Sequence, residues 1–453
     1  GGRSGPGGGG RPKGPARVPV MPNEHTQWVH DAATSNAMVE HVLGTGRGRT
    51  WISIDTEFFN RCCYQPSLCL MQIGTSDMVF LVDTIADEVL LAEIFERVLF
   101  NKEVTKVFHA PQQDLKVLHA FYDDLVDGGK ATPGKKRGTI QPVHDTQVAA
   151  QLLENKDHCP SYESFISNLL GVELPKSPHI TRSNWRKRPL SAEQLQYAYN
   201  DAKYLYQAYP KQVKKLKEKQ RIKWARECGK ELVAAYLWPS GVQREKLTPA
   251  IAWKTVKGKH WLLDAGLTIE DENDERYAAV RNFRALSAWR ELAAKKKDFP
   301  RSWILTDKHL IFLACAEDPI AACKDIELAK GKTSIYSADK LAVVLRRELP
   351  RHLSNVDKKS FLPLVGQRIP RKQANDRDAV IASITEELTD HCAAIDVSRE
   401  VVLSRRTLTD FLNAGPGTPE AYAVLSSWRT EVLGDIVTKH CTPFFAKYFP
   451  AAE

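Results

Sequence analysis

The chain has 453 residues, of which 43% are hydrophobic and 26% charged, and its formal net charge is +9. This length exceeds what one hydrophobic core usually organises, so we expect several domains. No stretch approaches the roughly 18 to 20 uninterrupted apolar residues that span a bilayer, which excludes an integral membrane protein. The composition favours a globular protein whose positive surface attracts polyanions such as nucleic acids.

The first 22 residues are rich in Gly and Pro, carry four basic side chains and contain no acid. Such a composition cannot bury enough apolar surface to fold alone, so we expect a disordered tail. It begins with Gly1 and lacks the apolar core of a signal peptide, which fits a trimmed end, the remnant of a tag or part of an organellar presequence. The nine scattered cysteines suggest reduced thiols in an intracellular protein, either cytoplasmic or in an organelle such as the mitochondrial matrix.

Three short apolar segments separated by turn-like residues predict a meander of three strands. They are WISIDTEF from Trp51, SLCLMQIG at 67–74 and MVFLVD at 78–83. A fourth strand is predicted at 106–110. The segments 89–100 and 113–122 have apolar residues spaced by three and four, which predicts helices packed on the sheet.

The next segment, 127–138, is rich in Gly and Lys, and we interpret it as a solvated loop rather than a dedicated RNA-binding loop. A short strand near Val143 follows, and helices are predicted at 147–153, 162–170 and 191–209. The first domain is therefore expected to be a mixed α/β layer fold.

Beyond Tyr209 no strand-like alternation of similar strength occurs, and 211–230 is a strongly basic helical stretch. Two changes in composition follow, an acidic run at 270–275 and a basic, Pro-containing segment around 368–377. Apolar helical patterns dominate between and after them, with a capping signal at Thr306 and Asp307. The sequence therefore predicts two small helical units after the α/β domain.

Two carboxylates in the first predicted strand, Asp55 and Glu57, lie two residues apart, so strand alternation places both on one face. Unpaired acids on a buried apolar strand are costly, and a bound cation would offset that cost. Acids near a strand end are also commonly solvated, so this pair needs further ligands to indicate a metal site.

Asp114 follows the strand at 106–110 by a short turn and can point back over the sheet edge, although acids in a first helical turn often only complement the helix dipole. Tyr197 and Asp201 lie four apart, so a helix presents the phenol and the carboxylate on one face. The alternative for this pair is a core Tyr beside a surface Asp.

The order of these motifs is more specific than any one of them. Asp-x-Glu in a strand, His-x4-Asp from His109 and Tyr-x3-Asp from Tyr197 resemble the DEDD exonucleases, in the variant whose third motif carries Tyr. The segment 51–206 resembles ribonuclease D in particular. The shared segments are DTEF, YxPxLCLxQ from Tyr64, KVFHA, HDTQ from His144 and NWRKRPLSAEQLQYAYNDAKYLY.

The resemblance implies an RNase H-like mixed sheet of about five strands and a cofactor of two divalent metal ions, Mg²⁺ or Mn²⁺. Asp55, Glu57 and Asp201 would hold the tighter ion, and Asp55 with Asp114 the second. Tyr197 would orient the attacking water. By the same resemblance Asp145 is a structural or supporting acid rather than a ligand, and His109 and Phe58 contact substrate.

The segment 289–314 resembles a helicase-and-ribonuclease-D C-terminal (HRDC) domain, and a weaker copy lies at 399–412 and 427–434. The fold class is therefore an α/β exonuclease domain followed by all-α HRDC domains. The expected organisation is a tail at 1–22, the exonuclease domain at 23–210, a basic helical connector at 211–274, an HRDC domain at 275–357 and a divergent HRDC-like domain at 358–453.

The resemblance implies a 3′-to-5′ exoribonuclease that trims RNA 3′ ends, of tRNA precursors or other small structured RNAs, and releases 5′-nucleoside monophosphates. The HRDC domains would recruit ribonucleoprotein or RNA-processing partners, and no membrane partner is expected. Two alternatives remain open: an RNA-binding or assembly factor with marginal activity, against which the intact acids argue, and a DNA 3′-to-5′ exonuclease with the same acids and Tyr. The Gly/Lys loop and the basic tail depart from the family pattern and leave substrate choice open.

Overall fold

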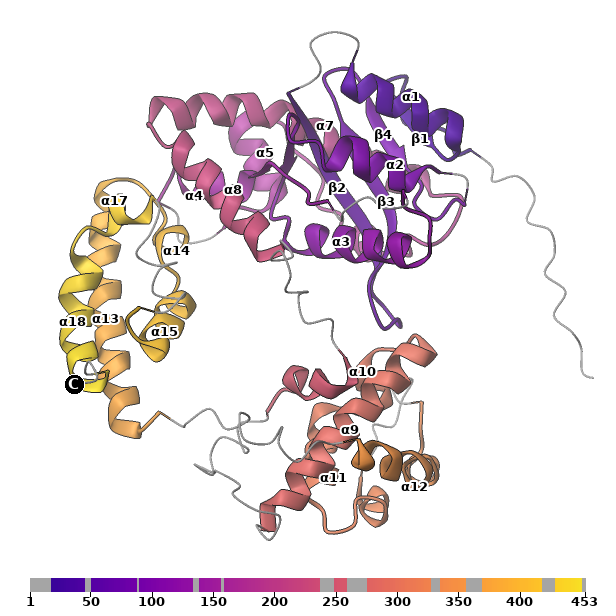
Figure 1. Cartoon of the computed structure of the whole chain (residues 1–453). Coiled ribbons are helices and arrows are strands. Elements are labelled where there is room, and N and C mark those ends of the chain that lie inside the picture. Colours follow the sequence, from indigo (N-terminus) through magenta and orange to yellow (C-terminus); the bar gives the residue numbers. More distant parts are fainter. Residues whose placement is uncertain are drawn as a thin grey trace, which may run out of the picture. The chain divides into compact units, whose positions relative to one another are not determined.

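The computed structural model describes residues 18–44, 50–87, 89–132, 138–155, 159–236, 248–258, 275–326, 335–355, 369–417 and 428–449. The chain divides into two compact units (Figure 1), of which the first comprises Gly1–Phe59, Leu68–Leu237 and Cys392–Val401. The second comprises Asn60–Ser67, Trp238–His391 and Val402–Glu453. We call them the α/β unit and the helical unit. Most of the predicted tail and of the acidic run lies outside the described residues, and so does the middle of the Gly/Lys loop.

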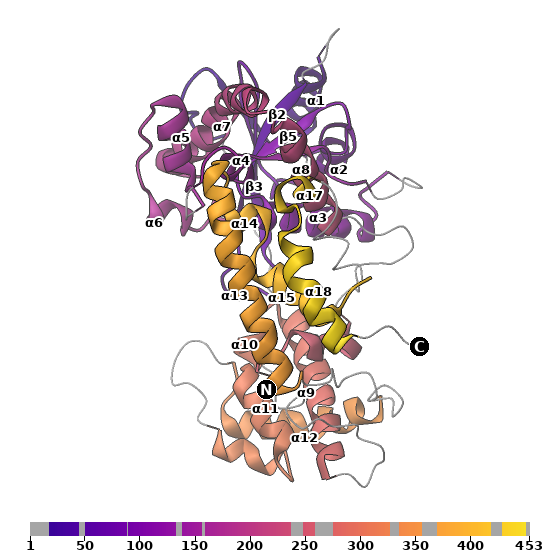
Figure 2. The same cartoon turned by 90° about the vertical axis from the view of Figure 1, so that its left-hand side faces the viewer.

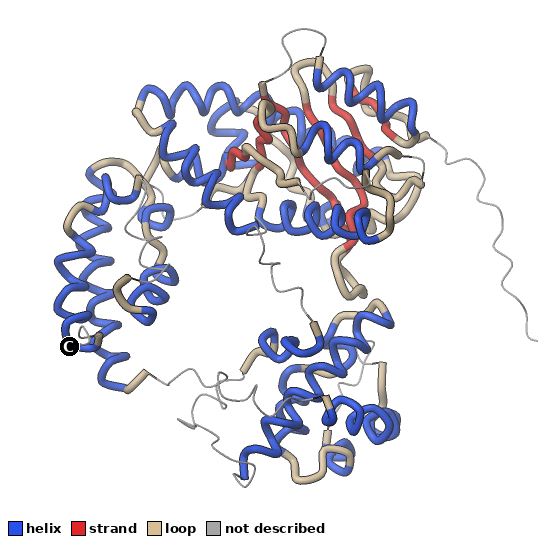
Figure 3. Tube along the Cα trace, viewed as in Figure 1, coloured by secondary structure: helices blue, strands red, loops and turns tan. Residues whose placement is uncertain are grey.

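A six-stranded mixed sheet in the order β1-β4-β3-β2-β5-β6 forms the centre of the α/β unit (Figure 3). Strands β3 and β4 are antiparallel, whereas the pairs β1/β4, β2/β5 and β5/β6 are parallel. The mixed sheet confirms the predicted fold class. The strands are β1 (Thr26–Val29), β2 (Trp51–Phe59), β3 (Ser67–Gly74), β4 (Val79–Val82), β5 (Thr105–Phe108) and β6 (Val143–Asp145).

The sheet has one strand more than predicted, because β1 was missed. That edge strand has the sequence TQWV and only four residues, too short and too polar at its start for a recognisable apolar alternation. Helix α1 (Ala32–Leu43) was missed as well, although Asp31 caps it: Thr34 N–H donates to Asp31 Oδ1 at 2.8 Å. The local sequence patterns of β1 and α1 are therefore too weak to predict them, and packing against the rest of the unit stabilises both.

The other predicted helices of this unit are present within a few residues, except that 89–100 becomes a short helix followed by a π-helical turn. The basic stretch 211–230 is split, because the chain turns at Gln220, whose φ is 58°. The elements are α2 (Leu91–Ile94), the π-helical turn η1 (Phe95–Leu99), α3 (Gln112–Asp127), α4 (Thr146–Gln151), α5 (Tyr162–Leu170), α6 (Pro178–Thr181), α7 (Ala192–Glu218) and α8 (Ile222–Tyr236).

The α/β unit continues through α8, beyond the boundary predicted at residue 210. Helix α8 packs on β6 at Gly229, where a Cβ atom would lie 2.2 Å from the carbonyl oxygen of Val143. Only glycine permits so close an approach of helix to strand. The basic segment after α7 is therefore part of the compact unit.

The two faces of β2 pack against different helices. Ile52 and Ile54 lie in a core that includes residues of α1 and α3. Ser53 faces α7, where its hydroxyl donates to the backbone carbonyl of Ala202 at 2.6 Å. A Cβ at Gly74 would lie 2.8 Å from that same carbonyl oxygen, so glycine lets α7 approach the sheet. Because strand residues alternate, Asp55 and Glu57 share the face of Ser53.

From residue 248 onward every described element is helical, in agreement with the predicted all-helical region. The core of its first part includes Phe283, Leu286 and Leu310. Thr306 caps its helix as predicted, since its side chain accepts from His309 N–H at 3.2 Å. The elements are η2 (Pro249–Thr255), α9 (Glu275–Lys297), α10 (Arg301–Ile304), α11 (Asp307–Cys315), η4 (Ala321–Asp325), α12 (Ala338–Ser354), α13 (Arg371–Ala394), α14 (Arg399–Val402), α15 (Arg405–Ala414), α17 (Arg429–Leu433) and α18 (Ile436–Tyr448).

Helices α13 and α18 run side by side (Figure 1, Figure 2). They are antiparallel, because Asp376 pairs with Lys447 at 2.5 Å and Glu387 with Lys439 at 3.0 Å. The change in composition predicted around 368–377 therefore overlaps the first turns of α13. Among the described residues no helix is both long enough and apolar enough to cross a membrane.

Candidate active site

Three acidic side chains converge where β2 faces α7. Asp55, Glu57 and Asp201 each offer a carboxylate oxygen, and these oxygens lie within 4.8 Å of one another. The strand supplies the first two through its alternation. Helix α7 supplies the third, at the residue before the carbonyl that Ser53 binds. The close packing at Gly74 therefore brings an acid from residue 201 to acids from residues 55 and 57.

The environment of these acids opposes their ionisation. Burial, followed by repulsion from Asp201 and Asp114, raises the pKa of Asp55 well above its usual range. Burial and the neighbouring acids raise the pKa of Glu57 in the same way, and burial raises that of Asp201. Hard divalent cations take oxygen ligands, and a cation would relieve this repulsion. The donor set therefore fits a divalent metal ion.

Asp114 lies in the first turn of α3, as predicted. Its carboxylate contacts β2 on the face opposite to the one that carries Asp55 and Glu57. Its Oδ1 accepts a hydrogen bond of 2.5 Å from the Thr56 hydroxyl. Thr56 points away from the face of Asp55 and Glu57, because it lies between them in the strand. Asp114 is still close enough for its charge to raise the pKa of Asp55. Thr56 could not be recognised from the sequence, since a single threonine in a strand carries no signal.

Asp145 supports the turn that leads to Asp114. Its Oδ1 accepts hydrogen bonds from the backbone N–H of Ala110 at 3.0 Å and of Gln147 at 2.9 Å. The second bond caps α4, and the first holds Ala110, whose φ of 55° is left-handed. This geometry agrees with the structural role expected for Asp145.

Tyr197 lies one helical turn before Asp201 on α7. Its hydroxyl accepts from the Thr181 hydroxyl at 3.4 Å, and it lies near enough to Asp201 for the two side chains to affect each other's pKa. Burial, with the charges of Asp201 and Asp55, raises the pKa of Tyr197 above its usual range. The phenol therefore stays protonated and keeps a proton to donate at neutral pH.

A pocket of about 470 Å³ adjoins Tyr197 and Asp201. Residues of α5, α6, α7 and the segment before α6 line it, among them Tyr162, Glu163 and His179. Sequence patterns did not point to these three residues, because they come from separate elements whose meeting depends on the fold. The pocket places open volume directly beside Asp201, the one of the converging acids that lines it.

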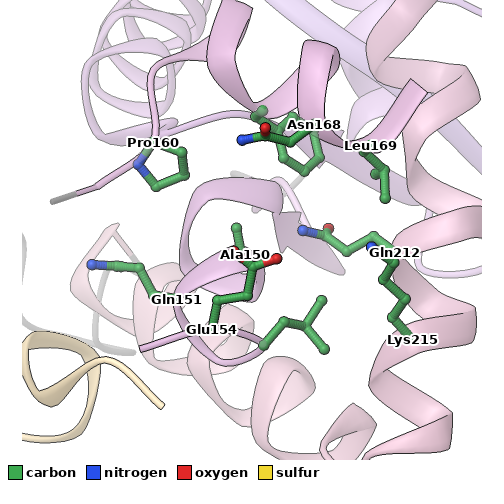
Figure 4. A pocket seen from close by; sticks show the side chains of 10 residues that line it. Ala150, Gln151, Glu154, Pro160, Asn168, Leu169, Gln212 and Lys215 are labelled. Atoms are coloured by element: carbon green, nitrogen blue, oxygen red, sulfur yellow. The ribbon is translucent and has the colours of Figure 1, made fainter. Parts of the chain in front are cut away.

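A second, smaller pocket of about 60 Å³ lies among α4, α5 and α7 (Figure 4). Leu153, Phe165 and Leu169 provide apolar walls, and Gln151 and Lys215 are polar residues of its lining. None of the converging acids lines this pocket. It is therefore distinct from the acidic site.

The two side chains expected to touch substrate are largely engaged within the protein. The ring nitrogens of His109 lie 3.0 Å from Thr146 Oγ1 and 3.2 Å from the Pro160 carbonyl oxygen. Burial lowers the pKa of His109 to about 4, so the ring is neutral. Phe58 is partly buried and packs against the core of the α/β unit. In this structure both side chains support the fold, and their contact with substrate stays a prediction.

Comparison with known proteins identifies relatives of this fold and site. Residues 26–217 match the family model described as 3′-5′ exonuclease. Ribonuclease D of Sphingobium indicum is 27% identical over 406 residues, which cover 90% of this chain and 93% of the relative. Ribonuclease D of Bartonella henselae is 31% identical over 62% of this chain and 60% of its own length.

The crystal structure of Escherichia coli RNase D superposes with a TM-score of 0.69, at 19% identity over 92% of this chain and 99% of that one. At this identity the likeness concerns the fold. Together the comparisons confirm the resemblance to ribonuclease D over most of the chain and the prediction of a 3′-to-5′ exonuclease.

Proposed function

We propose that this chain, a relative of ribonuclease D, is a metal-dependent 3′-to-5′ exoribonuclease that removes nucleotides one at a time as 5′-nucleoside monophosphates. The observation that carries the proposal is the convergence of Asp55, Glu57 and Asp201, with Tyr197 one turn away on the same helix. RNA as the substrate is supported by the ribonuclease D relatives and by the net charge of +9.

The acids would hold two divalent ions, Mg²⁺ or Mn²⁺. Asp55, Glu57 and Asp201 would bind one, and Asp55 with Asp114 the other, while Thr56 keeps its hydrogen bond to Asp114 Oδ1. Such ions stabilise the charge that develops on the attacking and leaving oxygens of a phosphodiester. The raised pKa values of the acids support this role, because a cation favours their ionised forms.

Tyr197 would hold the attacking water beside the scissile phosphate. Its hydroxyl already contacts the Thr181 hydroxyl, and its ring lies one turn before Asp201 on the same helix, so the phenol is placed beside the acids before substrate binds. The adjoining pocket of about 470 Å³ is large enough for a terminal nucleotide. We therefore place the 3′ end of the RNA in this pocket.

For the natural substrate we propose small structured RNAs, such as tRNA precursors. The helical elements from residue 275 onward would act as HRDC domains, 275–357 and 358–453, that contact the body of a folded RNA or bind RNA-processing partners. Support comes from their all-helical structure and from the ribonuclease D relatives that match most of the chain.

Degradation of RNA and DNA oligonucleotides of the same sequence would test the proposal. With Mg²⁺ or Mn²⁺ we expect the RNA to shorten from its 3′ end in steps of one nucleotide, with a 3′-blocked RNA as the resistant control. Faster shortening of the DNA would favour a DNA exonuclease. Tight RNA binding without shortening, at any concentration of either metal, would favour a binding or assembly factor.

A further inference from the structure

Tyr162, the first residue of α5, places a second phenol in the wall of the active-site pocket. Its hydroxyl donates to the backbone carbonyl of Asp201 at 2.7 Å and lies 3.1 Å from that of Asn200. The contact is with the backbone of a metal-ligand candidate, not with its carboxylate. Tyr162 can therefore influence where Asp201 sits without competing for the cation.

A further hydrogen bond reaches helix α7 from the sheet. The Ser53 hydroxyl of β2 donates to the carbonyl of Ala202 at 2.6 Å. Three consecutive carbonyls of α7, from residues 200, 201 and 202, thus meet hydroxyl groups from outside the helix. Carbonyls inside a helix already accept from the backbone of the next turn. These extra donors are therefore available to fix the position of α7 between the sheet and α5.

Tyr162 is itself held in place by the structure around it. Its ring meets that of His109 edge to face, with centroids 5.6 Å apart. His109 lies 3.2 Å from the carbonyl of Pro160, two residues before Tyr162, and Ser161 caps α5 by accepting from Ser164 N–H. The phenol is thus anchored through β5 and α4 as well as through its own helix.

We infer that Tyr162 is a positioning residue that, together with Ser53, holds Asp201 at the distance from Asp55 and Glu57 that metal binding requires. The inference rests on the proposed function, because it assumes that Asp201 binds a metal ion. Groups that orient a metal ligand typically change metal affinity or activity by about 10- to 100-fold when removed. The loss of one hydroxyl that acts through the backbone should lie near the lower end of that range.

The variant Tyr162→Phe removes the hydroxyl and keeps the ring against His109. We expect kcat on short RNA to fall about tenfold and the half-saturating Mn²⁺ concentration to rise by a similar factor, while KM for RNA stays within about twofold. Saturating Mn²⁺ should restore most of the rate. Because Mn²⁺ would also stabilise a partly unfolded protein, the metal-free melting temperature is compared as well, and a value equal to that of Tyr199→Phe separates positioning from a folding defect.

Tyr199→Phe is the matched control. Tyr199 lies on the same helix, its ring is buried, and its hydroxyl makes no hydrogen bond within the described part of the chain. This variant should behave like the unmodified chain in metal titration and in kcat. Ser53→Ala, which removes the donor that reaches α7 from β2, should repeat the Tyr162→Phe pattern and provides a second test if that protein is poorly folded.

Hydrogen exchange of the metal-free protein supplies a readout independent of activity. Amides of α7 near residues 201–206 should exchange faster in Tyr162→Phe than in the unmodified chain or in Tyr199→Phe, and calorimetry should show weaker Mn²⁺ binding. If Tyr162→Phe matches the control in both measurements while Asp201→Asn is inactive, the inference is overturned and the proposed function stands. If the unmodified chain degrades no RNA, the proposed function fails, whereas exchange and Mn²⁺ binding still decide the role of Tyr162.

Discussion

The Thr56 hydroxyl donates a 2.5 Å hydrogen bond to Asp114 Oδ1, and this bond connects the central strand to the first turn of α3. Both faces of strand β2 therefore contribute side chains that position the acids of the site. One face carries Asp55 and Glu57, and the other holds Asp114 through Thr56. The bond also lowers the pKa of Asp114, which burial otherwise raises.

Replacement of Thr56 by Val keeps the β-branched shape and removes the donor. Asp114 then loses the partner that favours its ionised form, so we expect weaker metal binding at the second position and a half-saturating Mg²⁺ concentration raised by about tenfold. Metal titration of single-turnover cleavage measures this. Thr84→Val is the control, because Thr84 is similarly buried and its hydroxyl has no partner among the described residues. Equal half-saturating Mg²⁺ concentrations for the two variants would show that the Thr56 hydroxyl does not contribute to metal binding.

Asp55→Asn and Asp201→Asn should each abolish hydrolysis and leave RNA affinity within a few-fold. Each change removes a metal ligand, whereas the basic surface that attracts RNA persists. Cleavage assays with Mg²⁺ and binding assays in EDTA separate the two effects, and Asp87→Asn, an exposed position, is the control. Near-normal trimming by Asp55→Asn protein, purified free of contaminating nuclease, would refute the metal assignment.

Tyr197→Phe should slow the chemical step by roughly 10- to 1,000-fold, the range for one positioned polar catalytic group. Metal affinity should change little, because the phenol orients water and does not hold the cation. Single-turnover rates at saturating Mn²⁺ measure the step, with Tyr199→Phe as the comparison. A rate equal to that of the unmodified chain would mean that Tyr197 does not act on the reacting groups.

The acidic site should make the stability of the metal-free protein fall as pH rises from about 4 towards 8, against the opposite contribution of His109 and His144, whose pKa values burial lowers to about 4. The pKa values of Asp55, Glu57 and Asp201 are raised in the folded state, and that of Asp145 is raised by burial to about 6. Between the unfolded and folded pKa values the folded state binds more protons, so deprotonation favours unfolding. Melting temperatures across this range, with and without Mn²⁺, provide the measurement.

The same linkage makes metal binding release protons, so the stabilisation by Mn²⁺ should grow as pH rises over that range. In Asp201→Asn protein both the fall in stability and the metal effect should be smaller. Equal pH dependence of the metal-free melting temperature in the unmodified chain and in Asp201→Asn protein would contradict the raised pKa values.

Truncation after about residue 270 should leave a protein that cleaves short single-stranded RNA, because all four acids and Tyr197 precede that point. It should also be less stable than the full chain. The segment Cys392–Val401 belongs to the α/β unit, and Asp396 in it pairs with Lys219 at 2.7 Å and accepts from Asn155 N–H at 2.8 Å. Thermal unfolding compared with that of full-length Asp396→Asn reports the effect of removing this segment.

On a tRNA-like substrate the truncated protein should show a shallower dependence of log affinity on log salt. The slope should decrease by about 0.7 to 0.9 for each phosphate group that the shortened protein no longer neutralises. The full chain measured on single-stranded RNA serves as the reference. Equal slopes, with equal rates on hairpin and single-stranded RNA, would assign the helical unit to protein partners or to a structural role.

Much of the α/β unit followed from local pattern. Alternating apolar residues predicted β2 and β3, and the spacing of Tyr197 and Asp201 placed both on one face of a helix. These features depend on residues two to four apart, where strand and helix geometry alone sets the direction of side chains. The order of the motifs then added the resemblance to ribonuclease D, which the comparisons confirm.

Only the tertiary structure decided how the acids are held. Thr56 binds Asp114 across 58 residues of sequence, Tyr162 binds the Asp201 carbonyl across 39 and Ser53 binds the Ala202 carbonyl across 149. No periodicity links positions so far apart, since each contact exists only after α7 has packed onto the sheet at Gly74. The identities of the acids were thus readable from the sequence, whereas their positions and supporting hydroxyls depend on packing that local pattern does not encode.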